Sequence, residues 1–359
     1  MADIQKQFEK FHDEIKLKRF IENKTLREKR DIIINKIKNG VKSHFEEQDE
    51  DVPELEFIDQ GSYSVDLGII PENNNYDIDE GIIFHLYKED YPDGVQFKKL
   101  IRDIMKNHTH TPPKIKNPCV TITYSLDDEP IYHVDLPVYI KTKQNSSVFL
   151  ARGKEFSEKK NKYWELADPQ GLKTYISSPI AALTDDDKKQ FKRIVRYMKK
   201  WKDICFFDDS TSRPPSVGIS VFADQLFAPS KKHDYLEDKD KYCDLDALKS
   251  FTYNLKDKFV PKWNYEREKY LYVISLNLPV APCTDIFCKM TDIQMNAFYE
   301  KLNDFDEALA KAQSLTDPHD ACKDLPKFLG DKFPVPESVS SRYKKVGLSS
   351  APSSNSAKD

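Results

Sequence analysis

The chain has 359 residues and a formal net charge of −4, with 39% hydrophobic and 12% aromatic residues. This composition predicts a folded protein of one large or two modest domains and excludes an intrinsically disordered chain. The acidic balance argues against DNA or RNA as an obligatory partner, because proteins that bind nucleic-acid backbones usually carry a basic excess.

The sequence also predicts a cytoplasmic protein with no membrane partner. No apolar run approaches the length of about 18 residues that a membrane helix needs, and the N-terminus is polar and charged. The six cysteines are scattered without a C-x-x-C pair, and we interpret them as reduced thiols. Cys283 and Cys288, with the distant His319, hint at zinc, but isolated cysteines are the favoured interpretation.

The first half of the chain mixes helices and strands. A charged helix is predicted over residues 1–47, with one apolar stripe that would brace a domain behind it. That stripe consists of Leu26, Ile33, Ile34, Ile37, Val41 and Phe45. The pattern changes to strands at Leu55. The elements predicted after that point are a strand over 57–58, a strand over 77–86, a helix over 95–107, and strands over 120–124 and 131–136 that form a hairpin around the turn at 127–130.

The second half is predicted to be mostly helical. Thr184 and Asp187 have the spacing of a capping box, which places the start of a long helix there. Further helical patterns cover residues 216–227, 244–257 and 291–313. We therefore expect a first domain over residues 1–178, a helical lobe over 179–334 and a disordered polar tail over 335–359.

Two acids with the spacing D-x-D open the strand predicted after residue 76. Side chains alternate across a strand, so Asp77 and Asp79 are expected on one face. Mg²⁺ prefers hard oxygen ligands, and a pair of carboxylates on one face suits it. A third acid, Asp135, lies inside an apolar strand pattern, where a lone carboxylate would be costly to bury. It would complete a two-metal site if the strands are neighbours, and an acid on the wet face of a hairpin is the equally weighted alternative.

Before these acids, the sequence places Gly61-Ser62 directly after a strand. Glycine allows close approach of backbone amides to phosphate, and the serine hydroxyl adds a donor. Gly-Ser alone is typical of a simple turn. The order of strand, Gly-Ser, loop, Asp-x-Asp and a distant strand Asp is more specific. It indicates a phosphate cradle beside a metal site.

That order resembles the polymerase β-like nucleotidyltransferase superfamily. The segments QGSYS, YDIDEGI and HVDLPV are similar to those of the cGAS/DncV-like nucleotidyltransferases, bacterial enzymes that make cyclic oligonucleotide signals in antiphage defence (CBASS). The likeness extends over most of residues 25–330. It includes Trp164, Asp168-Pro169, the segment Tyr-Met-Lys-Lys-Trp at 197–201 and Pro215-Ser216. The resemblance implies an α+β fold, with a mixed-sheet nucleotidyltransferase core, a bracing N-terminal helix and a helical second lobe across a cleft.

The resemblance also assigns roles to individual residues. It implies that Asp77, Asp79 and Asp135 are the catalytic acids, which bind two Mg²⁺ or Mn²⁺ ions. The residues that it assigns to nucleotide and phosphate binding are Gln60, Gly61, Ser62, Lys199 and Ser216. Helix geometry supports Lys199, which lies on the flank of an apolar stripe, whereas it places Lys200 opposite the stripe and in solvent. The alternative for Lys199 is an ordinary exposed lysine.

Two departures from the family limit what the resemblance implies. Val217 stands where the animal enzyme has a base-stacking tyrosine, so the base specificity does not carry over. A Cys/His cluster like the zinc thumb of the animal enzyme is not visible in the sequence. Together with the net charge, this predicts control by a protein of a defence operon or by a small ligand, not by double-stranded DNA.

The function that we predict is synthesis of a cyclic oligonucleotide, most simply a cyclic dinucleotide such as a cGAMP isomer, from ATP and GTP. Asp135 would hold or deprotonate the attacking ribose hydroxyl, and Lys199 and Ser62 would stabilise the departing pyrophosphate. One alternative is a transferase with a linear product, of the oligoadenylate or RNA-tailing kind. The other is an inactive nucleotide-binding scaffold.

Overall fold

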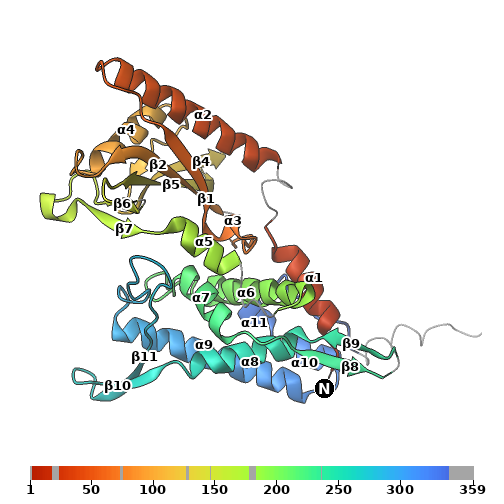
Figure 1. The fold of residues 1–359 in the computed structure, drawn as a ribbon. Helices are drawn as coiled ribbons and strands as arrows, with labels where there is room; N and C mark the ends of the chain where they lie inside the picture. The colour runs from red at the N-terminus through yellow and green to blue at the C-terminus, as the bar shows by residue number, and fades with distance from the viewer. Residues whose placement is uncertain are drawn as a thin grey trace, which may run out of the picture.

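The computed structural model describes residues 2–17, 24–72, 76–126, 129–145, 147–177, 183–235 and 237–338. Within these ranges, residues 24–26, 76, 77, 126 and 129–131 are described by their backbone only. Two lobes are visible in Figure 1, an upper lobe built on a sheet and a lower lobe built on helices. No helix in the described ranges has the length and apolar character needed to cross a membrane.

The upper lobe is a seven-stranded mixed sheet with the strand order β1-β2-β5-β4-β3, to which β6 and β7 are added beside β5. Only β2 and β5 pair in parallel, and the other pairs are antiparallel. The strands are β1 (Leu55–Gln60), β2 (Tyr76–Tyr87), β3 (Lys114–Ile115), β4 (Cys119–Leu126), β5 (Glu129–Lys141), β6 (Val148–Arg152) and β7 (Tyr163–Ala167). The predicted hairpin of two strands is confirmed as β4 and β5.

Helices α2 (Lys24–Glu46) and α4 (Val95–Met105) cover one face of this sheet (Figure 1). Alternating residues of the central strands, such as Ile82 of β2 and Val138 of β5, are buried against them. The opposite face carries the residues of the other parity, including Asp79 and Asp135. One face of the sheet is therefore packed in the core of the upper lobe, and the other face is directed toward the second lobe.

The N-terminal segment forms two helices, not the single helix predicted over residues 1–47. The stripe of α2 (Ile33, Ile37, Val41 and Phe45) is buried against the sheet, as expected of a brace. Helix α1 (Gln5–Ile15) packs instead in the core of the helical lobe, where Phe8 and Phe11 contact Tyr197. It has an apolar stripe of its own, and this stripe explains why it packs apart from α2.

The lower lobe is arranged around α6 (Asp185–Cys205), which begins at the predicted capping box of Thr184 and Asp187. Tyr197, Met198 and Trp201 on this helix are completely buried. The lobe also contains α1, α7 (Ser216–Leu226), α8 (Asp244–Lys256), α9 (Asp292–Ser314), α10 (Pro318–Cys322) and α11 (Pro326–Leu329). Helices α7, α8 and α9 confirm the three predicted helical segments.

Two hairpins in the lower lobe were not predicted: β8 (Lys231–Asp234) with β9 (Lys239–Tyr242), and β10 (Val260–Asn264) with β11 (Lys269–Val273). Their strands are short and mostly exposed, so they lack the alternation that marks a half-buried strand. Between the lobes lie the single-turn helix α3 (Gly61–Ser64) and α5 (Pro169–Ser177) (Figure 1). The predicted domain limit at residue 178 and the tail residues 339–359 lie outside the described residues.

Candidate active site

Two of the three predicted acids lie side by side on adjacent strands. Asp79 of β2 and Asp135 of β5 occupy paired positions in the parallel register. The Thr121 hydroxyl donates to Oδ1 of Asp135 at 2.5 Å, and Lys116 Nζ lies 3.7 Å from the same oxygen. The Asp135 side chain is 21% exposed and lines a cavity, so it does not lie on an open face of the hairpin. Asp77 is paired with His133 in the same register, but its side chain lies outside the described residues.

The Gly61-Ser62 segment begins directly at the end of β1 and lies against Asp79. Gly61 has a left-handed backbone (φ 67°), and a Cβ atom placed on it would be 2.0 Å from Oδ2 of Asp79. Glycine is therefore needed here for two independent reasons, its conformation and the space it leaves. The segment forms the helical turn α3, in which the Ser64 hydroxyl donates to the Gly61 carbonyl at 3.0 Å.

Gln60, the last residue of β1, lies opposite Asp79 in the antiparallel pair with β2. Its side chain is held by Tyr139, a residue that the sequence did not indicate. The Tyr139 hydroxyl of β5 donates to Oε1 of Gln60 at 3.0 Å. Nε2 of Gln60 is buried over Gly81 and has no hydrogen-bond partner among the described residues. Gln60 and Tyr139 line the same cavity as the two acids.

The acids open into a cavity of about 490 Å³ between the two lobes. Its walls include Ser62, Asp79 and Asp135 from the upper lobe and Lys199 and Ser216 from the lower lobe. A second cavity of about 630 Å³ lies beside it, and Ser62, Lys199 and Ser216 line both. The structure therefore brings the described members of the predicted site together, and these three residues stand where the two cavities meet.

Lys199 is buried at this junction with only 3% of its surface exposed. Its Nζ donates to the Leu67 carbonyl at 3.0 Å. Burial, together with the charges of Lys202 and Arg196, lowers its pKa to about 7. The alternative of an ordinary exposed lysine is excluded.

The prediction that Lys200 is solvated was wrong. This side chain is 0% exposed, donates to the Ile70 carbonyl at 3.3 Å and forms an ion pair with Glu72. The reason is that α6 is packed on more than one face. The segment after α3, which includes Ile70 and Glu72, covers the face opposite the apolar stripe. A stripe predicts solvation only when one face of a helix is packed.

Further charged groups that the sequence did not indicate also line the cavities. The Lys202 amine donates to the Ser216 hydroxyl, and Arg213 forms an ion pair with Asp203 at the wall of the larger cavity. In the acid-lined cavity, Arg152 Nε donates to Glu165 at 2.6 Å. Lys202 lies three residues after Lys199 and so on the same side of the helix, a signal that helical spacing alone could have supplied.

The donor set of the acid pair fits a hard divalent cation. Asp79 and Asp135 offer carboxylate oxygens from adjacent strands, and Mg²⁺ is commonly held by one or two carboxylates together with substrate phosphates. Among the side chains that the structure describes, no three His, Cys, Asp or Glu residues are grouped as metal ligands. The remaining predicted acid is Asp77, whose side chain lies outside the described residues.

The segment that holds β1, α3, β2 and the paired acids matches a known protein family. Residues 55–139 match the model described as "Cyclic GMP-AMP synthase DncV-like, nucleotidyltransferase domain". Over these residues the chain is similar to a DncV-like nucleotidyltransferase domain. The acids Asp79 and Asp135, with Gln60, Gly61 and Ser62, all lie inside this domain, whereas Lys199 and Ser216 are supplied by the helical lobe.

One curated relative of the DncV-like domain is a cyclic GMP-AMP synthase of Escherichia albertii, 27% identical over 180 residues. That match covers 48% of this chain and 37% of the relative, so it spans little more than a third of that synthase.

Solved structures extend the likeness of fold to nearly the whole chain. CdnC of E. coli MS115-1 with ATP is 16% identical with a TM-score of 0.62, over 92% of this chain and 98% of CdnC. The CD-NTase CdnG of Bradyrhizobium diazoefficiens with GTP is 12% identical with a TM-score of 0.63, over 90% and 95% of the two chains. The chain therefore shares the two-lobed fold of these structures, an α+β fold with a mixed sheet and a helical second lobe, as predicted.

Proposed function

We propose that this chain is a metal-dependent nucleotidyltransferase that joins nucleoside triphosphates into a cyclic oligonucleotide, most simply a cyclic dinucleotide such as a cGAMP isomer. The observation that carries the proposal is the pairing of Asp79 with Asp135 against Gly61, at a cavity that continues past Lys199 and Ser216. Carboxylates at one end and cationic and hydroxyl donors at the other match the two needs of nucleotidyl transfer, activation of a hydroxyl and binding of a triphosphate.

Each group then has a definable role. Asp135 would hold the attacking ribose hydroxyl and accept its proton, and its contacts with Thr121 and Lys116 would keep its carboxylate oriented. Bound at Asp79 and Asp135, Mg²⁺ or Mn²⁺ would lower the pKa of that hydroxyl and neutralise phosphate charge. Ser62 and Ser216 provide hydroxyl donors to the phosphates. The triphosphate would raise the pKa of Lys199 above its value of about 7, so that this lysine becomes charged when substrate binds.

ATP and GTP are the proposed substrates. CdnC was solved with ATP and CdnG with GTP, and both have the fold of this chain. The cavity is large enough for nucleotides and includes Val217 in place of an aromatic side chain.

We also propose that the product is a signal in antiphage defence and that a protein partner controls its synthesis. CdnC has been solved in a complex with HORMA-deltaN, and it is similar in fold to this chain. The net charge of −4 disfavours a long nucleic acid as the activator.

The proposed reaction is tested by incubating the purified chain with Mg²⁺ or Mn²⁺ and each pair of triphosphates. Pyrophosphate release and phosphatase-resistant products of cyclic mass are expected, and linkage-specific nucleases then assign 2′-5′ or 3′-5′ bonds. Phosphatase-sensitive ladders would show a linear-product enzyme. No pyrophosphate from any pair, with ATP or GTP still bound, would indicate a nucleotide-binding scaffold.

A further inference from the structure

The segment that follows α3 is anchored to α6 by two consecutive residues. The Asp66 carboxylate accepts from Lys192 Nζ at 3.0 Å and from Arg196 Nη2 at 2.8 Å. The Asp66 carbonyl accepts from the same Nη2 at 2.5 Å, and the next carbonyl, that of Leu67, accepts from Lys199 Nζ at 3.0 Å. The three cations are four and three residues apart on α6, so they project from one side of the helix.

This anchor leads directly to the phosphate-binding segment Gly61–Ser64, here called the phosphate loop. The Leu67 amide donates to the Ser62 carbonyl at 2.8 Å, which closes the segment back onto the loop. A displacement of residues 66 and 67 therefore moves the Ser62 peptide. Asp66 is not among the described residues that line either cavity, so it would act on a bound phosphate only through the loop.

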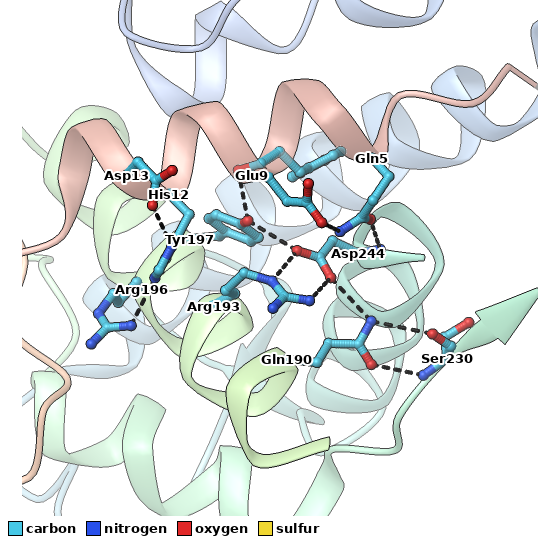
Figure 2. A network of polar contacts seen from close by, with 11 residues as sticks. Gln5, Glu9, His12, Asp13, Gln190, Arg193, Arg196, Tyr197, Ser230 and Asp244 are labelled. Atoms are coloured by element: carbon cyan, nitrogen blue, oxygen red, sulfur yellow. Dashed lines mark hydrogen bonds and ion pairs between the residues drawn. The ribbon is translucent and has the colours of Figure 1, made fainter. Parts of the chain in front are cut away.

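Arg196 is itself held in a fixed position. It is 2% exposed, and its Nη1 lies 2.8 Å from Nε2 of His12 on α1. Figure 2 shows this contact within a polar network that joins α1 to α6 and α8. The anchor for Asp66 is thus a buried guanidinium (Arg196) with little freedom to move.

Asp66 has an unusual backbone conformation for a residue with a side chain. Asp66 has a φ of 56°, in the left-handed region that few residues other than glycine adopt. Glycine would take this conformation at lower cost, and aspartate is among the residues that tolerate it. The position therefore carries a carboxylate where the backbone alone would favour glycine.

We propose that Asp66 is a positioning residue for nucleotidyl transfer, and that its ion pair with Arg196 holds the phosphate loop against Lys199. The proposal rests on the proposed function, because it concerns the same phosphate site. The phosphate loop continues β1 of the upper lobe, whereas Arg196 belongs to the helical lobe, so the pair ties the two lobes together beside the site. Val65 and Leu67 add apolar contacts with the same helical core. Loss of the pair should therefore loosen the loop without detaching it.

The test is the substitution Asp66→Gly, which keeps the left-handed backbone without strain and removes only the carboxylate. We expect the Kd for ATP with Mg²⁺ to rise about tenfold, the size of effect seen for residues that couple to a site without touching ligand. Binding of AMP, which lacks the β- and γ-phosphates, should stay unchanged. Asp66→Asn keeps the shape and loses the charge, and an intermediate Kd is expected.

A matched control separates positioning from general loosening of the lobe. Asp306 is also a buried carboxylate with two lysine partners, Lys249 and Lys256, both at 2.9 Å, and it joins α8 to α9. Asp306→Asn should lower stability and leave the Kd for ATP at the wild-type value.

The outcomes separate this proposal from the proposed function. Pyrophosphate release by the wild-type chain measures the function, whereas the ratio of ATP Kd values measures positioning even without turnover. A wild-type Kd in Asp66→Gly would overturn the proposal, as would an equal rise in Asp306→Asn or a wild-type chain that does not bind ATP. If Asp66→Gly fails to fold, Arg196→Lys replaces it, because lysine lacks the forked guanidinium whose Nη1 and Nη2 contact His12 and Asp66 at the same time.

Discussion

Gly61 and Asp79 are packed so closely that a methyl group on Gly61 would lie 2.0 Å from the Asp79 carboxylate oxygen. The residue at the end of β1 must therefore be a glycine as long as the Asp79 carboxylate of β2 keeps its position. This contact joins the phosphate-binding side of the candidate site to its metal-binding side.

Gly61→Ala should abolish turnover while most of the fold survives. The added Cβ would push the Asp79 carboxylate out of place and strain a left-handed backbone, so we expect kcat/KM to fall at least about a hundredfold and the free energy of unfolding by about 1–2 kcal/mol. Gly330→Ala is the control, because Gly330 also has a positive φ (87°) but lies outside both cavities. It should lose similar stability and keep full turnover. Equal losses of activity in both variants would contradict the prediction.

Asp79→Asn should remove activity without weakening the metal-free protein. Neighbouring carboxylates repel each other when no cation is bound, so removing one charge is expected to leave the melting temperature unchanged or raised. Turnover should fall at least about a hundredfold. Thermal unfolding without divalent cations, together with pyrophosphate release with Mg²⁺, measures both effects. A clear drop in melting temperature would mean that Asp79 mainly stabilises the fold.

His12 should make the protein less stable in mild acid. Its pKa is lowered to about 4, first by burial and then by Arg196 and Arg193, and its side chain is only 14% exposed. In the unfolded chain His12 binds a proton below about pH 6.5, whereas in the folded chain it binds one only below about pH 4. The free energy of unfolding should therefore fall as the pH drops through this window, by up to about 3 kcal/mol. Urea denaturation at pH 7 and pH 4.5 measures the change.

The matched variant for this experiment is His12→Gln, whose carbonyl oxygen can still accept from Arg196 but does not titrate. Its loss of stability between the two pH values should be smaller than that of the wild type. Parallel loss in both proteins would show that other groups, and not His12, cause the acid sensitivity.

Lys199 should take up a proton when a triphosphate binds. Its pKa of about 7 in the free protein would rise beside phosphate, so at pH 8 binding is expected to consume a fraction of a proton and to weaken as the pH rises further. Calorimetry in buffers of different ionisation enthalpy measures this uptake. Lys199→Met should abolish the uptake and weaken ATP binding. Lys301→Met, which removes a lysine that also bonds a backbone carbonyl (that of Cys205) but lies outside both cavities, should do neither.

Local patterns predicted much of this architecture. The apolar strand patterns around Ile82 and Val134, the capping box at Thr184 and the stripe of α2 each depend on neighbours within a few residues, and each was found where it was expected. The order of Gly61, Asp79 and Asp135 along the chain was sufficient to indicate the chemistry. These signals are readable because the periodicity of an element and the caps at its ends are local properties.

Contacts between distant segments could not be predicted in the same way. The pairing of Asp79 with Asp135 depends on β2 lying in parallel with β5, and nothing local to either strand specifies that partner. The helical stripe predicts that Lys200 lies in solvent, because a stripe implies one buried face, but packed segments surround α6 and bury this side chain. Helix α1 was grouped with α2 by sequence proximity, although its own apolar stripe belongs to the other lobe.

The sequence by itself determined most of the long helices and central strands, and the chemical character of the site: an acid pattern, a Gly-Ser pair and a lysine on a long helix. Only the tertiary structure decided which acids share a face, that Gly61 must be a glycine to admit Asp79, and that Asp66 links the phosphate loop to Arg196. The physical reason is that side-chain chemistry and periodicity belong to a single segment of chain. Register, burial and ion pairs across lobes arise only when separate segments are packed together.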